Sequence, residues 1–246
     1  MNAIVFGGSK GMGRAVARRL AQRGDAIFLL GRDVVDLAKS AEDLAARSPS
    51  SSRPGLAACD LADPHGFQGA LDAAFGALGR VDVVVVTAAV FDSQQALEED
   101  PARLRSLLDA DFTATLLFCE AARRRLLAQG GGTLCVFSSV AGDRGRKPVV
   151  LYGAAKAGLS AYLEGIDHKF HSQGLRVVCV KPGFVKTGMT AGLAPPPFAG
   201  EPDGVARIVV RAIDRGTPVV YAPKIWRWVL FVIRRLPRFV MRRISF

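Results

Sequence analysis

The sequence predicts an α/β protein in which seven parallel strands form a doubly wound sheet with helices on both faces. Short runs rich in Val, Ile and Leu alternate with longer stretches of helical composition over 246 residues. The short runs are continuously apolar, as expected of strands that are covered on both faces. The first run leads directly into a glycine-rich turn followed by a helical segment, which is how such a sheet commonly begins.

The elements follow one another in regular order. The predicted strands are 3–6, 26–30, 56–59, 81–86, 133–137, 176–181 and 219–222. The predicted helices are 13–23, 33–46, 64–78, 101–129, 151–171 and 202–215. Two loops rich in Ser, Pro and Gly, 48–55 and 188–200, lie between these elements. We therefore expect one domain, residues 1–223, followed by a basic tail, residues 224–246.

The glycine-rich turn after the first strand is a candidate phosphate-binding loop. Gly7, Gly11 and Gly13 allow a tight turn, a close approach of backbone N–H groups to a pyrophosphate and close packing of the helix on the strand. Ser9, Lys10 and Met12 fill the positions between them. A glycine turn without a ligand is the alternative, but the position between a strand and a helix favours a dinucleotide.

The end of the second strand indicates which dinucleotide is bound. Arg32 follows Gly31 where an acid would bind the ribose 2′-hydroxyl of NAD, and an arginine there suits the 2′-phosphate of NADP. Lys10 offers a second cation, and Asp33 is expected to cap a helix. We therefore predict NADP(H) rather than NAD(H). Asp60, followed by Leu61, is placed either to accept from the adenine amino group or to cap the next helix.

Three polar residues lie at the end of the fifth strand and on the helix that follows it. Ser139 follows the fifth strand, and Tyr152 and Lys156 lie one helical turn apart on the next helix. Hydride transfer to a carbonyl needs a proton at the developing alkoxide, which a phenol can supply when an ammonium lowers its pKa. Ser139 would hydrogen-bond the substrate oxygen. An ordinary amphipathic pair at 152 and 156 is the alternative.

These residues together resemble the short-chain dehydrogenase/reductase family from Asn2 to about Ala222. The resemblance implies a Rossmann-like fold and an NAD(P)-dependent oxidoreductase. It also implies cofactor contacts from the turn after the sixth strand, where Pro182, Gly183 and Thr187 meet the nicotinamide, and from small residues after the fourth strand. The contact residues are Pro182, Gly183, Val185, Thr187, Ala88 and Ala89, together with Tyr152 and Lys156.

Two positions depart from the family pattern. Val86-Thr87 replaces a pair of asparagines after the fourth strand, and Asp111 stands where the family has a catalytic asparagine. We predict that Asp111 belongs to the catalytic set and can anchor a proton-relay water near Lys156. Its negative charge is expected to alter the pH dependence.

Composition excludes several classes of protein. The chain is 50% apolar and 22% charged, which is typical of a folded globular protein and not of a disordered or collagenous one. Four cysteines lie in or beside apolar runs without paired spacing, so we predict buried thiols, no disulfides and no metal site. No secretory signal is recognised at the N-terminus, and cytoplasmic localisation is expected.

Positive charge is concentrated in the tail. The formal net charge is +11, and residues 215–246 hold eight Lys or Arg and no acid, which leaves 25 cations against 22 acids before them. Arginines alternate with Trp and aliphatic residues, and Pro237 is expected to divide two short helices. This pattern favours attachment to the inner face of the cytoplasmic membrane through an anionic surface. The alternative is that the tail packs on its own domain or on another subunit. Nucleic-acid binding is not expected. We expect the protein to form a homo-oligomer.

The tail also resembles that of the decaprenylphosphoryl-2-keto-ribose reductases, a subgroup of the family. The similarity covers Val219-Val220-Tyr221-Ala222-Pro223, Trp226-Arg227 and Arg234-Arg235-Leu236-Pro237-Arg238. It implies a lipid-linked keto-sugar substrate, with loop 188–200 as the mobile lid and Met189, Leu193 and Phe198 as apolar contacts. A 3-ketosphinganine or long-chain 3-ketoacyl substrate is an alternative. A catalytically weak NADP(H)-binding sensor or scaffold is the alternative from another class.

Overall fold

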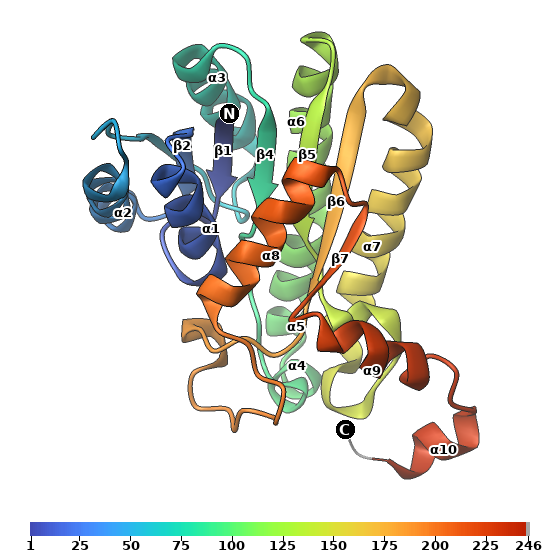
Figure 1. Ribbon diagram of the computed structural model, residues 1–246. Coiled ribbons are helices and arrows are strands. Elements are labelled where there is room, and N and C mark those ends of the chain that lie inside the picture. Colours follow the sequence, from blue (N-terminus) through green and yellow to red (C-terminus); the bar gives the residue numbers. More distant parts are fainter. Residues whose placement is uncertain (245–246) are drawn as a thin grey trace.

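The seven predicted strands form one parallel sheet in the order β3-β2-β1-β4-β5-β6-β7 in the computed structural model, which describes residues 1–244 (Figure 1). Their bounds are β1 Asn2–Phe6, β2 Ala26–Gly31, β3 Gly55–Ala58, β4 Val83–Val86, β5 Gly132–Phe137, β6 Leu175–Pro182 and β7 Val219–Ala222. The order reverses between β1 and β4, where such sheets bind their ligands. The predicted fold class is confirmed.

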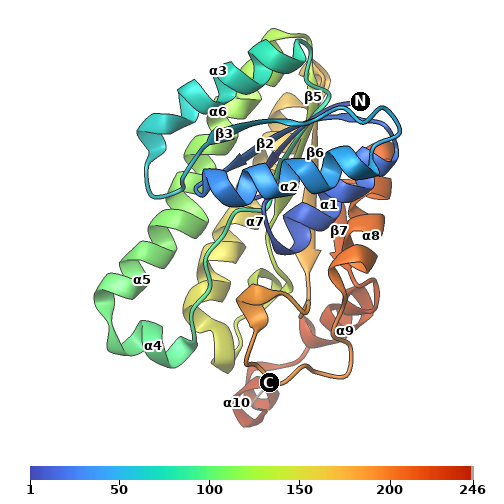
Figure 2. The same cartoon turned by 90° about the vertical axis from the view of Figure 1, so that its left-hand side faces the viewer.

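Helices cover both faces of the sheet (Figures 1 and 2). One face carries α1 Gly11–Gln22, α2 Val34–Arg47 and α8 Pro202–Arg215. The other carries α3 Phe67–Leu78, α6 Thr115–Ala128 and α7 Val150–Phe170. Neighbouring residues of β1 show why its run is apolar throughout, since Val5 packs on the first face and Phe6 on the second, and both are buried.

The long helix predicted over 101–129 is interrupted. The chain forms α5 Pro101–Leu108, a wide π-helical turn at Asp109–Ala114 and then α6. The hydroxyl of Thr115 donates to the carbonyl of Ala110 at 2.8 Å within the wide turn. This turn places Asp111 in the interior, where it is fully buried. A π turn of this kind often marks a functional site.

Short elements account for the other differences from the sequence prediction. Helix α4, Gln94–Glu99, was not predicted; it begins at Ser93, whose hydroxyl accepts from the amide of Ala96 at 3.1 Å. Single 3₁₀ turns occur at Pro64–Gly66, Val140–Asp143, Lys147–Val149, His171–Gln173 and Gly188–Thr190. Helical elements of one or two turns are too short to produce a recognisable hydrophobic period in the sequence.

The tail forms two helices, α9 Ile225–Ile233 and α10 Arg238–Arg243, and Pro237 directly precedes the second as predicted. Trp226, Leu230 and Ile233 on one face of α9 pack against Val140 of the domain. Within residues 1–244 no helix combines the length and apolar character needed to cross a bilayer. The four cysteines are free and buried, as expected.

Candidate active site

The glycine-rich loop requires its glycines for steric reasons. Gly7 and Gly11 have φ angles of +89° and +55°, a region that favours glycine. A Cβ on Gly13 would collide with the carbonyl of Gly7 and the hydroxyl of Thr87. The loop therefore closes tightly over the end of β1 and presents the N-terminus of α1 at the carboxyl edge of the sheet, where anions bind favourably.

A cleft of about 960 Å³ extends along this edge. It runs from the end of β2 across the glycine loop to the residues after β4 and to Thr187. The predicted cofactor residues that line it are Gly7, Ser9, Lys10, Gly11, Met12, Gly13, Arg32, Asp60, Leu61, Ala88, Ala89 and Thr187. Its length and the closeness of the glycine backbone fit a dinucleotide.

The other predicted cofactor residues lie outside the lining of this cleft; they are Tyr152, Lys156, Pro182, Gly183 and Val185. Pro182 ends β6 and is buried, and Gly183 follows it against the indole of Trp226. Val185 is buried in the core and its backbone forms a β-bridge with Gly200. The turn after β6 is thus held from two sides, by the tail and by the end of loop 188–200.

Cations and acids meet where the adenosine half of a dinucleotide would lie. Arg32 is exposed there, and Lys10 forms an ion pair of 2.5 Å with Asp36. The hydrogen bond from Lys10 holds the pKa of the Asp36 carboxyl below its usual value. Asp33 caps α2 as predicted, by accepting from the amide of Asp36 at 3.0 Å.

Asp60 forms a local turn at the end of β3. Its carboxylate accepts from the amide of Ala62 at 3.0 Å, while the next 3₁₀ turn is capped by Asp63. Asp60 also lines the cleft. The alternative that Asp60 caps the next helix is therefore wrong, because Asp63 takes that position, and a contact of Asp60 with an adenine stays a prediction.

Ser139, Tyr152 and Lys156 come together where β5 ends against α7. Ser139 begins a 3₁₀ turn by accepting from the amide of Ala141 at 3.1 Å. The preceding Ser138 donates to the carbonyl of Lys156 at 2.9 Å. A Cβ on Gly142 would meet the backbone of Lys156, so the turn and the helix pack without space between them. This packing fixes the serine relative to the helix.

Asp111 joins this group through a buried ion pair. One carboxylate oxygen lies 3.0 Å from Nζ of Lys156, and the two residues are 0% and 1% exposed. The other oxygen accepts from the amide of Val90 at 2.7 Å. The ring of Phe91, the next residue, packs edge-on against Tyr152 with 5.2 Å between ring centroids. The structure therefore places Asp111 beside Lys156, and its catalytic role stays a prediction.

Burial and charge act in opposite directions on the two titratable groups of α7. Burial raises the pKa of the Tyr152 phenol; Lys156 and a hydrogen bond with Ser139 lower it, Asp111 raises it, and the pKa stays above the usual value. Burial lowers the pKa of Lys156, but Asp111 and Tyr152 outweigh this effect, and the pKa is raised. At neutral pH the phenol therefore holds its proton beside a charged ammonium.

Thr87 is a site residue whose role the sequence did not indicate. Its hydroxyl donates to the carbonyl of Phe6 at 2.9 Å and lies directly against Gly7. Thr87 thereby fastens the end of β4 to the glycine loop and lines the cleft. A threonine directly after a strand was the only indication in the sequence. Its partner, Phe6, lies in a strand 81 positions away, so the contact could not be predicted from neighbouring residues.

A second missed group links the walls of the catalytic centre. Asp143, in the turn after Ser139, accepts from Lys181 at 2.5 Å and from the hydroxyl of Tyr221 at 2.7 Å. Burial and this hydrogen bond raise the pKa of Tyr221 to about 12. Three strand ends, those of β5, β6 and β7, are tied together by one carboxylate. No local sequence pattern connects these residues.

The tail lies against the same walls. Trp226 contacts Gly183, and Val140 packs with Trp226, Leu230 and Ile233. The backbone of the tail also accepts two hydrogen bonds from the segment after Ser139. Arg144 donates to the carbonyl of Leu236 at 2.9 Å and Lys147 to that of Arg242 at 2.7 Å. One face of α9 therefore packs on the catalytic domain, which was the alternative to membrane attachment in the sequence analysis.

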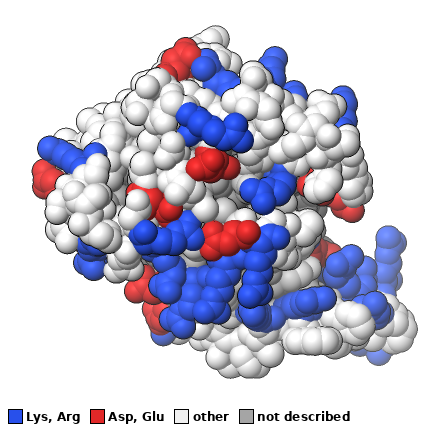
Figure 3. All heavy atoms as spheres, turned by 45° about the horizontal axis from the view of Figure 1, so that its top comes forward, with Lys and Arg blue, Asp and Glu red and all other residues white. Residues whose placement is uncertain are grey.

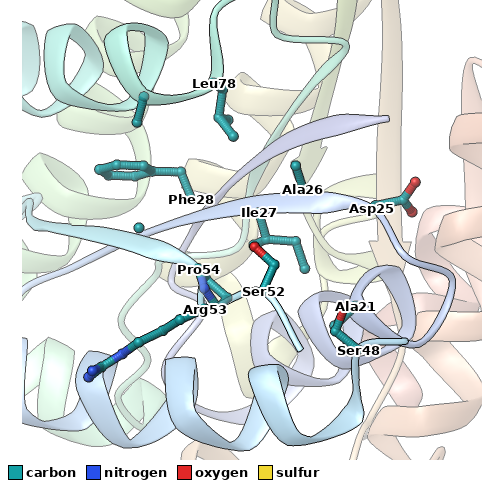
Figure 4. A pocket seen from close by; sticks show the side chains of 12 residues that line it. Ala21, Asp25, Ala26, Ile27, Phe28, Ser48, Ser52, Arg53, Pro54 and Leu78 are labelled. Atoms are coloured by element: carbon teal, nitrogen blue, oxygen red, sulfur yellow. The ribbon is translucent and has the colours of Figure 1, made fainter. Parts of the chain in front are cut away.

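A smaller cleft of about 280 Å³ lies at the opposite, amino edge of the sheet (Figure 4). Its two charged side chains already have partners, since Asp25 pairs with the N-terminus and Arg23, and Arg53 pairs with Glu42. Within residues 1–244 no cluster of His, Cys, Asp and Glu is arranged to hold a metal ion. The chemistry-bearing residues are gathered at the carboxyl edge.

Comparison with known proteins gives a consistent result. Residues 1–196 match the family described as short chain dehydrogenase. An uncharacterized oxidoreductase of Mycobacterium tuberculosis is 34% identical over 241 residues, 98% of this chain and 95% of that protein. Carbonyl reductase family member 4 of Danio rerio is 34% identical over 192 residues, 78% of each chain. A short-chain type dehydrogenase/reductase from Mycobacterium ulcerans has the same fold, with a TM-score of 0.84 at 20% identity over 99% of this chain and 98% of that one.

Proposed function

Because the chain belongs to the short-chain dehydrogenase family, we propose that it is an NADPH-dependent reductase of a ketone in a lipid-linked or amphipathic substrate. The observation that carries this proposal is the grouping of Ser139, Tyr152 and Lys156. This group is linked to a dinucleotide-sized cleft through Asp111, which pairs with Lys156 and accepts from the amide of Val90 in the cleft lining. The similarity to a carbonyl reductase over 78% of the chain supports the direction of the reaction.

The residues of the chain have separate roles in the proton transfer. The cleft would hold NADPH, which would supply the hydride when bound. Ser139 donates a hydrogen bond to the carbonyl oxygen, and Tyr152 gives its proton to the same oxygen as charge develops there. The ammonium of Lys156 stabilises the resulting phenolate, and Asp111 holds that ammonium in place at 3.0 Å. The raised pKa of Tyr152 suits a proton donor in the reduction direction.

Discrimination for NADPH is assigned to Arg32 and Lys10. A 2′-phosphate at the end of β2 would meet the exposed guanidinium of Arg32 and compete with Asp36 for Lys10. We expect Arg32→Ala to raise the Kd for NADPH by roughly tenfold and to leave that for NADH within about twofold. Equal losses for the two cofactors, measured by fluorescence titration, would contradict this assignment.

A polyprenyl-phosphate keto-sugar is the favoured substrate class, and a long-chain 3-keto lipid is the alternative. Both have a ketone beside a long apolar chain, which suits loop 188–200 with its exposed Met189, Leu193 and Phe198. Exposed cations of the tail favour the phosphodiester of the first class. Attachment of a homo-oligomer to the inner face of the cytoplasmic membrane is part of this proposal.

Single-turnover hydride transfer tests the proposal. The full chain loaded with NADPH is mixed with a polyprenyl-phosphate keto-sugar, a 3-ketosphinganine or a 3-ketoacyl thioester in detergent micelles, and the loss of NADPH absorbance is followed. Oxidation with one of them identifies the class. Tight NADPH binding without oxidation by any of the three substrates would instead favour a sensor or scaffold. The carboxylate of Asp111 beside Lys156, where the family has an asparagine, is the observation that motivates this alternative.

A further inference from the structure

Loop 188–200 presents an uncharged surface to solvent. It holds no Asp, Glu, Lys or Arg, and Met189, Leu193 and Phe198 are 42%, 46% and 49% exposed. The two ends of the loop are fastened: Lys186 pairs with Glu201 at 2.7 Å, and the amide of Lys186 donates to the carbonyl of Gly200 at 2.9 Å. Charges therefore lie at the base of the loop and apolar side chains along its length, an arrangement that water disfavours.

Helix α9 has a second apolar face that does not pack on the domain. Trp226, Leu230 and Ile233 are buried, but Trp228, Phe231 and Val232 are 65%, 49% and 58% exposed. Phe239 on α10 is 60% exposed. One face of α9 is thus anchored to the catalytic domain while the other turns large apolar side chains outward.

Exposed cations accompany this outer face. They are Lys224, Arg227, Arg234, Arg235, Arg238, Arg242 and Arg243. None of them forms an ion pair with a carboxylate in the part of the chain that the structure describes. The cations of the catalytic domain differ, because many of them have acidic partners: Arg18 pairs with Asp43 and Arg23 with Asp214. Figure 3 shows basic and acidic side chains side by side over the upper face.

The loop and the tail lie at the same end of the molecule. A Cβ on Gly200, where the loop ends, would lie 2.7 Å from the ring of Pro223, where the tail begins. Both views place the loop, α9 and α10 at the carboxyl edge of the sheet (Figures 1 and 2). Met189 lines the cleft and Trp226 contacts Gly183, so the two segments flank the catalytic centre.

We propose that loop 188–200 and the outer face of α9 and α10 form one surface that binds an anionic lipid bilayer, with the active site opening toward the lipid. Arginines without a carboxylate partner attract anionic headgroups, and Trp and Phe partition into the interface. This inference deepens the proposed function and rests on it for the substrate, because a lipid-linked ketone would reach the site without crossing water.

A second copy of the chain is a weaker occupant of this surface. A two-fold symmetric interface would place the same patch on both sides. The seven cations would then face seven cations with no acid from the tail or the loop between them, and like charges across an interface are unfavourable. A bilayer that contains anionic lipid supplies the missing negative charge.

Fluorescence quenching tests whether the loop reaches the bilayer. In a Trp228→Phe background, Phe198→Trp places a reporter on the loop, and Phe75→Trp places a matched reporter on α3, at the other end of the molecule. The background protein retains the buried Trp226, so its own quenching is measured separately and subtracted from both. The full chain is mixed with vesicles of phosphatidylcholine and phosphatidylglycerol whose acyl chains are brominated. Quenching of the loop reporter but not of the α3 reporter is expected. If the protein co-sediments with the vesicles but the loop reporter is not quenched, the proposal that loop and tail form one membrane surface is wrong.

Vesicle affinity gives an independent measurement. Phe198→Asp is expected to weaken binding to the same vesicles by roughly tenfold, because an apolar insertion is lost and a like charge is added. The matched control is Val35→Asp, which adds the same charge at a 64% exposed valine on α2 and should leave affinity within about twofold. Equal effects of the two changes would contradict the proposal.

Two outcomes separate this inference from the proposed function. Hydride transfer to a micellar ketone without any vesicle binding would refute the membrane surface and leave the reductase in place. Vesicle binding without hydride transfer would support the membrane surface and refute the reductase. A dimer that dissociates with Phe198→Asp in sedimentation velocity, together with no vesicle binding, would assign the surface to a second copy instead.

Discussion

Lys156 in the catalytic centre and the cations of the tail lie in opposite environments. Lys156 is 1% exposed and pairs with Asp111 at 3.0 Å, whereas Arg227 and Arg238 are exposed and without a carboxylate partner within residues 1–244. The buried cation is fixed by a single neighbour, so its field acts at one place, on Tyr152. The exposed cations have no carboxylate partner within residues 1–244, and we propose that they attract an anionic bilayer.

This difference shows how position determines the use of the same charge. Taking an ion pair out of water is costly, and the loss of one partner leaves an uncompensated charge in the interior. Exposed cations carry little stability, since water and salt screen them. Changes at the catalytic centre should therefore affect turnover and folding, and changes on the tail should affect attachment alone.

Tyr152→Phe is the strongest way to separate chemistry from attachment. Removal of the phenolic proton should lower turnover by about 10²–10⁴-fold, the usual contribution of a general acid. The ring still packs on Phe91, so the Kd for NADPH and the affinity for anionic vesicles should stay within about twofold. Stopped-flow oxidation of NADPH and vesicle co-sedimentation provide the two measurements. Retained turnover would show that another group donates the proton.

Lys156→Met tests the energetic side of the same comparison. The carboxylate of Asp111 would be left buried without its partner, and the free energy of unfolding should fall by about 3–5 kcal/mol. Urea unfolding measures this change. Arg105→Met, which removes one partner of an exposed pair with Asp109, should cost less than about 1 kcal/mol.

The double variant Lys156→Met with Asp111→Asn makes the test specific. An amide in place of the buried carboxylate removes the unpaired charge, so part of the stability lost in Lys156→Met should return. A double variant no more stable than the single one would mean that the loss comes from packing of the lysine stem and not from the charge.

The sequence carried enough information for the sheet and much less for the catalytic walls. Each strand is a continuous apolar run whose register is decided by burial, so patterns such as Val83–Val86 are readable locally. The wide turn at Asp109–Ala114 is not readable, because a single inserted residue leaves the helical composition unchanged. The burial of Asp111 results from this turn and therefore could not be predicted either.

The candidate site shows the same limit. Ser139, Tyr152 and Lys156 could be predicted because their spacing lies within one strand–turn–helix segment. The group formed by Asp143, Lys181 and Tyr221 could not, since its members are separated by 38 and 78 positions and meet only through the order of β5, β6 and β7. The two faces of α9 were likewise ambiguous until Val140 was seen to cover one of them.

Asp111→Asn should alter the pH dependence more than the rate. Asp111 raises the pKa of Tyr152, so an uncharged amide lowers that pKa and the alkaline limb of the reduction profile moves to lower pH. The amide oxygen can still accept from Val90, which keeps the local structure. Rates of the two proteins across the alkaline range measure the shift, with Asp72→Asn on α3 as the exposed control. An unmoved limb would show that the carboxylate does not act on the phenol.

Arg227→Gln with Arg238→Gln addresses the tail and should give the smallest change in the folded protein. Both side chains are exposed, so the free energy of unfolding should change by less than about 0.5 kcal/mol, and turnover with a micellar ketone should stay within about twofold. Each cation near an anionic leaflet contributes about 1 kcal/mol, so affinity for vesicles with phosphatidylglycerol should fall by roughly tenfold or more. The loss should disappear at high salt, where the parent chain also loses its electrostatic attraction. A loss of affinity that salt does not reduce would place the arginines in the apolar contact itself, and the division of roles between charge and aromatic insertion would then be wrong.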